Sequence, residues 1–312
     1  MNKATHTRMT RLLRILTGLL LLPLGACAIF NARYNRWDRK IPRNKDEVAE
    51  FAAEFQMGNG KTALLMIHGF GDGPGVWKGL AAELANKGFH VHAIRLPGWG
   101  EPMDVKRDIE RDDWLTKIES ELETLQADHE QVAVMAHSMG GCLAGYLAQD
   151  GRLNADALIL YAPMFAVSNA RSPILSTRRW QAIGSAILPD DMVVESLFQD
   201  HARVGEPRPK HERDPFVPIH LFDVLYDLMD DFTEQEARVD LPVCLVLPGE
   251  DRVVRSDVAR EWFEKLAAPA KTLREENEAG HVLPLDLNFH RESDRIALWL
   301  QENLKGPATD SN

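Results

Sequence analysis

The chain has five short, nearly continuous apolar runs, and segments with helical spacing lie between them. The runs are rich in Val, Ile and Leu and cover residues 62–69, 90–98, 131–138, 156–163 and 241–249. Such runs are typical of strands buried on both faces of a sheet. The helical spacing is found in residues 76–87, 112–128, 139–150 and 255–267. Strands that alternate with helices predict an α/β fold, with a mostly parallel central sheet and helices on both faces.

The alternation stops between residues 164 and 239. This segment contains six prolines and two helix-like pieces, at 174–188 and 219–232, and it lacks a strand pattern. It is far longer than an ordinary connection. We therefore expect a core formed by residues 46–163 and 240–312, with a helical cap, residues 164–239, inserted after the sixth strand. A purely structural insertion is the alternative. Edge strands within 46–60 are not discernible.

The N-terminus has the pattern of a targeting segment. Four basic residues precede a ten-residue apolar run, Ile15 to Leu24, which is too short to span a membrane and suits a secretory signal. The run ends in "LGAC", which resembles the lipobox of bacterial lipoproteins and predicts a signal peptide over residues 1–26 and lipid attachment to Cys27. An uncleaved signal anchor that continues through Phe30 is the alternative. Either way, the body is expected on the periplasmic side of a bacterial cell envelope.

Charge is distributed unevenly along the chain. Residues 1–26 carry +4 and residues 27–45 carry +5, which leaves −20 on residues 46–312 within a net charge of −11. Such an acidic body argues against nucleic acid as a partner. The basic tether, residues 27–45, would be attracted to an anionic membrane surface. It is expected either to lie along the lipid headgroups or to be a solvated spacer. Alanine at position 28, after the lipobox cysteine, resembles lipoproteins sorted to an outer membrane.

The two cysteines beyond the lipobox, Cys142 and Cys244, lie in a predicted buried helix and strand. They are expected to be free core thiols, and the sequence has no metal-ligand spacing.

One strand-to-helix junction carries a candidate nucleophile. In "VAVMAHSMGG", residues 132–141, a buried strand leads directly into a helix, and Ser138 lies where they join. Ala136, Ser138 and Gly140 match G-x-S-x-G with alanine in the first position. Small side chains are needed there because strand and helix approach closely around a strained serine. The turn would direct the N-terminus of the helix at a developing anion.

A nucleophilic serine needs a positioned base, which is itself oriented by an acid. Hydrolases with this elbow use the order Ser, acid, His. Here Asp251 follows a strand in "VLPGEDRVV", and His281 lies in the loop "ENEAGHVLPLD". Glu250 is a rival acid, although consecutive residues point apart. His137 is expected to pack beside the elbow, and His68 to form a structural hydrogen bond.

At this point the sequence resembles the α/β-hydrolase family, most closely its monoacylglycerol-lipase-like and serine-aminopeptidase-like carboxylesterases. The resemblance covers nearly all of residues 60–305. The matching blocks, in the family's order, are "MIHGFGDGPGVW", "RLPGWGE", "AHSMGG", "PGEDRVV" and "AGHVLP". It implies that Ser138 is the nucleophile, His281 the general base and then acid, and Asp251 the orienting carboxylate. Arg95 departs from the family, whose corresponding loop commonly reads D-x-P-G-x-G.

The resemblance also suggests how the oxyanion would be stabilised. One donor should be the backbone N–H of Met139, and the other that of Phe70 in the "HGF" loop. The side chains of both residues would then be free to line the acyl pocket. Trp77 and Trp99 are expected either to form walls of the substrate pocket or to be packing residues.

The resemblance implies a serine hydrolase of carboxylic esters that uses no metal or organic cofactor. A membrane anchor and a mostly apolar cap favour a small lipid-like ester, such as a monoacylglycerol or lysophospholipid, although a fold does not fix a substrate. A serine aminopeptidase is an alternative and would need an acidic pair in the cap, for which Asp230 and Asp231 are candidates. An acyltransferase on the same triad and a non-catalytic tethered binding protein are the others; the intact triad argues against the last.

Overall fold

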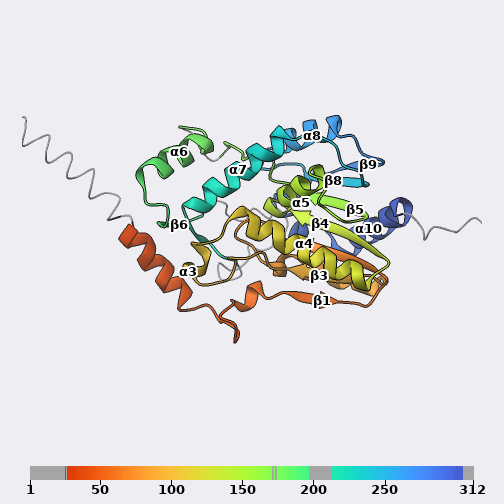
Figure 1. Cartoon of the computed structure of the whole chain (residues 1–312), viewed down its shortest axis with the longest axis horizontal. Helices are drawn as coiled ribbons and strands as arrows, with labels where there is room; N and C mark the ends of the chain where they lie inside the picture. Colours follow the sequence, from red (N-terminus) through yellow and green to blue (C-terminus); the bar gives the residue numbers. More distant parts are fainter. Residues whose placement is uncertain (1–24, 26, 171, 173, 197–212, 305–312) are drawn as a thin grey trace, which may run out of the picture.

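A single seven-stranded sheet forms the centre of the molecule, with strand order β1-β3-β2-β4-β5-β8-β9 (Figure 1). The computed structural model describes residues 25, 27–170, 172, 174–196 and 213–304. β1 is antiparallel to β3, and every other neighbouring pair is parallel. The predicted mostly parallel sheet is therefore confirmed. In chain order its strands are β1 (Phe55–Met57), β2 (Thr62–Ile67), β3 (His90–Ile94), β4 (Gln131–His137), β5 (Ala157–Tyr161), β8 (Val243–Pro248) and β9 (Lys271–Glu276).

Helices cover both faces of this sheet (Figure 1). α2 packs against α10 on one face, and α5 packs against α4 and α7 on the other. The longer core helices are α2 (Lys78–Asn86), α4 (Arg111–Asp128), α5 (Met139–Gln149), α8 (Ser256–Lys265) and α10 (Phe289–Asn303). The short helical turns are η1 (Glu50–Ala52), η2 (Pro74–Trp77), α3 (Met103–Lys106) and α9 (Leu283–Asp286).

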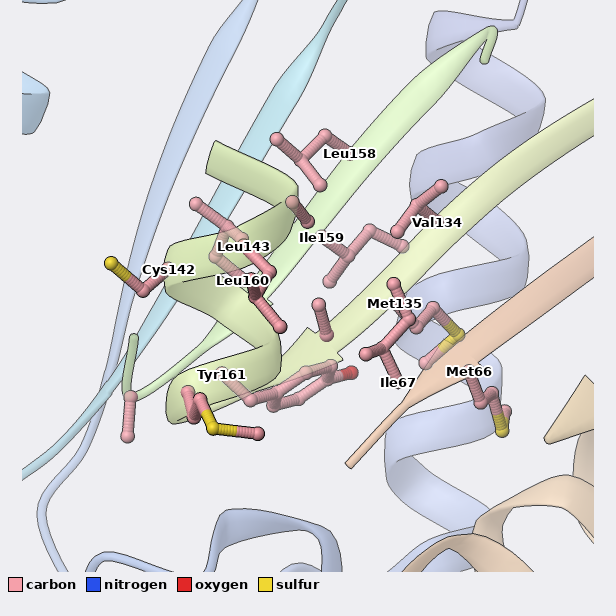
Figure 2. Packing of buried hydrophobic residues seen from close by; sticks show 14 of the residues in the cluster. Met66, Ile67, Val134, Met135, Cys142, Leu143, Leu158, Ile159, Leu160 and Tyr161 are labelled. Atoms are coloured by element: carbon pink, nitrogen blue, oxygen red, sulfur yellow. The ribbon is translucent and has the colours of Figure 1, made fainter. Parts of the chain in front are cut away.

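The central strands are buried almost throughout, which explains their continuous apolar sequences. Every residue of β5 and β8 is buried, and so are all but the first residues of β2 and β4. Figure 2 shows part of this core, with side chains of β2, β4 and β5 and with Cys142 and Leu143 of α5. Because helices cover both faces, neither set of alternating side chains faces water.

The insertion joins β5 to β8, and its content differs from the prediction in two respects. It contains α6 (Thr177–Ile187), β6 (Val193–Glu195), β7 (Phe216–Pro218) and α7 (His220–Glu234). β6 and β7 form a small antiparallel sheet between the two helices, which the sequence pattern did not indicate. The insertion follows the fifth described strand in chain order rather than the sixth, because β1 is the one described strand before β2.

The two helices of the insertion have different environments. α7 is amphipathic and packs on α5 through a buried stripe that includes Leu225, Leu228 and Phe232. The ring of Phe232 stacks on that of Phe165, with centroids 3.9 Å apart. α6 contacts α7, and none of its described residues is buried. α7 is therefore part of the packed core, and α6 lies at the surface.

The basic segment before the core is folded onto the molecule. Residues 27–38 are helical, and the side chain of Tyr34 is buried against Phe216 of β7, with ring centroids 5.9 Å apart. The Tyr34 hydroxyl accepts a hydrogen bond of 3.1 Å from the backbone N–H of Met103. This part of the predicted tether is thus docked and is not a solvated spacer.

The predicted signal peptide lies outside the described residues except for Gly25. Cys27 is a partly buried free thiol at the start of the N-terminal helix. Within the described residues, none of the helices is both long and apolar enough to cross a membrane.

Candidate active site

Ser138 occupies a sharp corner between β4 and α5. Its backbone has φ 54° and ψ −116°, a left-handed conformation that is strained for a residue with a side chain. The corner is held by a hydrogen bond of 3.0 Å from the Ser138 N–H to the carbonyl of Tyr161 at the end of β5. A Cβ on Gly140 would lie 2.5 Å from the carbonyl oxygen of His68, so that position admits glycine alone. The glycine of the motif is therefore a steric requirement of the turn.

The structure brings the three predicted catalytic side chains together. Ser138 Oγ lies 3.0 Å from His281 Nε2, and His281 Nδ1 lies 2.8 Å from Asp251 Oδ2. The other carboxylate oxygen of Asp251 accepts hydrogen bonds from the backbone N–H groups of Val253, at 2.8 Å, and Val254, at 2.9 Å. In this arrangement the Nδ1–H of His281 donates to Asp251, and Nε2 accepts the serine hydroxyl proton.

Burial and hydrogen bonding shift the pKa of the Asp251 carboxyl in opposite directions. The Asp251 side chain is 1% exposed, and burial alone would raise the pKa of its carboxyl. The charge and hydrogen bond of His281, with the two backbone donors, outweigh burial and hold the pKa of Asp251 below its usual value. Glu250, the rival acid, is exposed to solvent. Asp251 is therefore the carboxylate that reaches His281.

Two further histidines lie beside the triad and bond to backbone. His68 donates from Nδ1 to the carbonyl of Gly69, at 2.9 Å, and accepts at Nε2 from the N–H of Leu96, at 3.1 Å. This confirms the expected structural hydrogen bond. His137 packs beside the elbow as expected, and its Nε2 also donates to the carbonyl of His281 at 3.0 Å. This hydrogen bond was not predicted, because the sequence does not show that the end of β4 meets the loop of His281.

The loop after β2 lies directly beside the nucleophile. A Cβ on Gly69 would be 3.0 Å from the Cβ of Ser138, which places the neighbouring Phe70 next to the elbow. Met139 is the first residue of α5, and the first N–H groups of a helix have no partner within it. Phe70 is 3% exposed, and its ring packs edge-on against Trp99 with centroids 4.7 Å apart. The two predicted oxyanion donors thus belong to backbone that lies close to Ser138.

Both tryptophans proposed for the substrate pocket are fully buried. Trp77 packs against Tyr161, with ring centroids 5.7 Å apart, and Trp99 lies between Phe70 and Trp114. Trp99 therefore contacts Phe70, which lies beside the elbow, whereas Trp77 packs on Tyr161 of β5. Whether either indole contacts a substrate stays a prediction.

The unusual Arg95 is compensated within its own loop. Its guanidinium lies 2.9 Å from the carboxylate of Glu101, which also accepts the N–H of Gly98 at 2.7 Å. The N–H of Arg95 donates to Glu54 at 3.0 Å. Glu101 and Glu54 thus place carboxylates around Arg95, so its charge is balanced locally.

The acidic pair considered for an aminopeptidase is already bound to arginines. Asp230 pairs with Arg178, and Asp231 pairs with Arg111. The Asp230 and Asp231 side chains are 51% and 46% exposed, respectively. These contacts weaken the interpretation of the two aspartates as a receptor for a substrate amine.

Cys142 and Cys244 are buried free thiols, as expected for core positions. In the part of the chain that the structure describes, there is no group of three or more His, Cys, Asp or Glu side chains that could hold a metal ion.

Comparisons with known proteins identify the family to which the chain belongs. Residues 58–288 match the family model described as serine aminopeptidase, S33. A pimeloyl-[acyl-carrier protein] methyl ester esterase of Proteus mirabilis is 32% identical over 117 residues, which are 36% of this chain and 42% of that protein. A carboxylesterase of Bacillus subtilis is 22% identical, over 74% of this chain and 89% of the relative.

The fold also matches solved structures. A monoacylglycerol lipase of Paleococcus ferrophilus superposes with a TM-score of 0.65 at 21% identity, covering 80% of this chain and 98% of that one. The chain therefore belongs to the serine aminopeptidase S33 family and is an α/β-hydrolase of the esterase and lipase type.

Proposed function

We propose that the protein is a serine hydrolase that cleaves carboxylic esters through an acyl-enzyme on Ser138. The observation that carries this proposal is the chain of contacts from Ser138 Oγ to His281 Nε2, at 3.0 Å, and from His281 Nδ1 to Asp251, at 2.8 Å. A serine activated by an oriented imidazole is the arrangement that acyl transfer requires.

The reaction follows from this geometry in two halves. Ser138 Oγ attacks the ester carbonyl carbon while its proton moves to His281 Nε2, and the imidazolium then gives that proton to the departing alcohol. Water loses a proton to the same nitrogen and attacks the acyl-enzyme, and the imidazolium then returns that proton to Ser138 Oγ as the carboxylic acid is released. Asp251 stabilises the imidazolium in both halves. The backbone N–H groups of Phe70 and Met139 would bind the oxyanion, each contributing about 3 kcal/mol.

Lipid-like esters are the substrate class that the surface of the insertion favours. Ile174 and three residues of α6 expose large apolar side chains: they are 82% (Ile174), 48% (Trp180), 41% (Ile183) and 64% (Ile187) exposed. Trp180, Ile183 and Ile187 are spaced by three and four residues, so they share one side of the helix. α6 carries no acidic residue. An apolar face on a helix without acidic residues suits the surface of an aggregated lipid, where a monoacylglycerol or lysophospholipid would be found.

Membrane attachment through Cys27 completes the proposal. The basic N-terminus and the lipobox-like "LGAC" support a signal peptide over residues 1–26 and lipid on the Cys27 thiol. We place the protein in a bacterial cell envelope, facing the periplasm, and the alanine after Cys27 favours an outer membrane over an inner one. The basic segment, residues 27–45, would add electrostatic attraction to anionic lipid.

The test is a chain-length series of aryl esters, measured on the wild type and on Ser138→Ala. We expect hydrolysis by the wild type and a loss of roughly 10⁴-fold or more in kcat for the variant, because the nucleophile is removed. A monoacylglycerol and a lysophospholipid, measured beside a short soluble ester, then address the substrate class. Activity near that of the wild type in Ser138→Ala would reject the mechanism.

Two alternatives share the triad and differ in their products. An aminopeptidase would release the amine from aminoacyl anilides, and the pairing of Asp230 and Asp231 with arginines argues against it. An acyltransferase would pass the acyl group to an added alcohol in preference to water, which product analysis detects. A non-catalytic binding protein would hydrolyse none of these compounds and would leave Ser138 unlabelled by a fluorophosphonate.

A further inference from the structure

Two residues at the base of the insertion hold the loop that carries Phe70. The N–H of Asp214 donates to the carbonyl of Gly71 at 2.8 Å, and the guanidinium of Arg213 donates to the carbonyl of Phe70 at 3.5 Å. The Nε of Arg213 also lies 3.8 Å from the carboxylate of Asp72. The two peptide groups that follow the Phe70 N–H are therefore both fixed by residues of the insertion.

The fit between these segments is close. Gly71 has φ 75°, in the region that favours glycine, and a Cβ there would lie 3.1 Å from the carbonyl oxygen of Asp214. A shift of the backbone at residue 214 would accordingly be transmitted to the loop beside Ser138.

The Asp214 backbone is in turn positioned by a buried ion pair. The carboxylate of Asp214 binds the ammonium group of Lys106, at the end of α3, and accepts a hydrogen bond of 3.1 Å from the N–H of Gly100. Lys106 also donates to the carbonyl of Phe216 at 3.0 Å, and its ammonium lies 5.5 Å from the ring centroid of Trp99. The Asp214 and Lys106 side chains are each 1% exposed. Two segments that are distant in the sequence, residues 100–106 and 214–216, thus meet at one carboxylate.

A buried ion pair of this kind fixes the positions of the groups bonded to it more than it stabilises the fold. Charges lose their hydration on burial, so a buried ion pair is often no more stabilising than apolar residues of similar volume. Its hydrogen bonds are nevertheless directional, and they permit a single arrangement of the groups that share them. Here those groups are Gly100, Phe216 and the backbone that binds the Phe70 loop.

We propose that Lys106 and Asp214 are positioning residues for the reaction, which hold the Phe70 N–H where the oxyanion of the tetrahedral intermediate forms. This inference rests on the proposed esterase function. Neither residue touches the substrate: Lys106 acts through Asp214, and Asp214 acts through the carbonyl of Gly71. The pair therefore affects stabilisation of the transition state and has little effect on binding of the ground state.

The test compares Lys106→Met, Asp214→Asn and the double variant, which carries neither buried charge and so avoids leaving one unpaired. The matched control is Glu292→Gln, which alters another buried carboxylate, 2% exposed, bonded to Tyr161 and Arg274. Rates are measured well below each variant's Tm and are expressed per Ser138 labelled by a fluorophosphonate. A second readout is inhibition by an aryl trifluoromethyl ketone. Ser138 Oγ adds to its carbonyl carbon, the hydroxyl proton passes to His281, and the ketone oxygen becomes an oxyanion.

We expect kcat for a short aryl ester to fall about 10- to 100-fold in the double variant, with KM changed by less than about threefold, because a displaced oxyanion donor weakens transition-state binding alone. Affinity for the ketone should fall by a similar factor. Glu292→Gln should lower Tm and leave both quantities near those of the wild type.

The possible failures are distinguishable. If the wild type neither hydrolyses esters nor is labelled at Ser138, the proposed function is overturned, and this inference with it. If the wild type is active and the double variant keeps its kcat and its ketone affinity, the inference alone is overturned, and the ion pair is merely structural.

Discussion

At the scale of single residues, two buried histidines beside the triad make the fold sensitive to acid. Burial lowers the pKa of His68 to about 4 and that of His137 to about 3. In an unfolded chain a histidine titrates near pH 6.5. As pH falls below about 6.5, the unfolded state therefore binds protons that the folded state does not. The free energy of unfolding then decreases until the pH reaches the folded pKa.

This dependence can be measured and assigned to one histidine. We expect the free energy of unfolding to drop between about pH 7 and pH 5, with each such histidine contributing about 1.4 kcal/mol per pH unit once its unfolded form is protonated. Urea unfolding of the wild type and of His68→Gln measures it, and the variant should lose part of the slope. His290→Gln, at a side chain that is 74% exposed, is the control. Identical slopes in the wild type and in His68→Gln would contradict the assignment.

The role of a single residue could be predicted from the sequence where that role depends on neighbouring positions in the chain. Ser138 was identified because the strand, the serine and the small residues are consecutive, and a left-handed corner needs that local pattern. Asp251 and His281 followed from their order along the chain. The sequence did not indicate that Lys106 pairs with Asp214, because isolated charged residues are typical of a protein surface. The pair exists only once the insertion is folded over α3.

At the scale of elements, the packing of α7 indicates that this helix stabilises the core. Phe232 is 2% exposed, stacks on Phe165, and lies 5.8 Å from the ring of Trp262 in α8. Phe232→Ala should lower the free energy of unfolding by about 3–5 kcal/mol, as is typical of aromatic truncation in a core. Trp180→Ala on α6, where the side chain is 48% exposed, should change it by less than about 1 kcal/mol. Urea unfolding compares the two, and equal losses would be evidence against this division of the insertion.

The elements that the sequence did not predict are strands that are either very short or only partly buried. β9 alternates between exposed and partly buried residues and has β8 as its neighbour at the sheet edge, so it lacks the apolar run that marks the central strands. β1 has three residues. β6 and β7 are equally short, and partners separated by more than twenty residues leave no hairpin signal between them. The central strands were predictable because two covered faces require an apolar side chain at nearly every position.

At the scale of the whole molecule, the basic segment and the exposed apolar face of α6 lie on one side. The N-terminal helix and α6 lie on the same side of the molecule, and the start of the described chain projects from it (Figure 1). The N-terminal segment is basic, α6 has an exposed apolar face, and the remainder of the chain is strongly acidic. If lipid is attached at Cys27, this side faces the membrane, and the acidic body is held away from anionic headgroups.

The two parts of this surface should contribute to membrane binding in different ways, which vesicle sedimentation can separate. The measurement uses unlipidated protein carrying Cys27→Ser. Neutralising three exposed residues of the basic segment should weaken binding to anionic vesicles by about 1 kcal/mol per charge, and this loss should shrink as salt is added. The neutralised residues are Arg36, Arg39 and Lys40.

The apolar part should behave differently, because its contribution does not depend on lipid charge. Trp180→Ser with Ile183→Ser should weaken binding to anionic and neutral vesicles alike, and that loss should persist in high salt. Leu298→Ser removes an apolar side chain that is 57% exposed on α10, and it should leave binding unchanged. If the charge variant binds anionic vesicles as tightly as the wild type at low salt, the docked basic segment has no electrostatic role at the membrane. Attachment would then depend on the lipid and the α6 face.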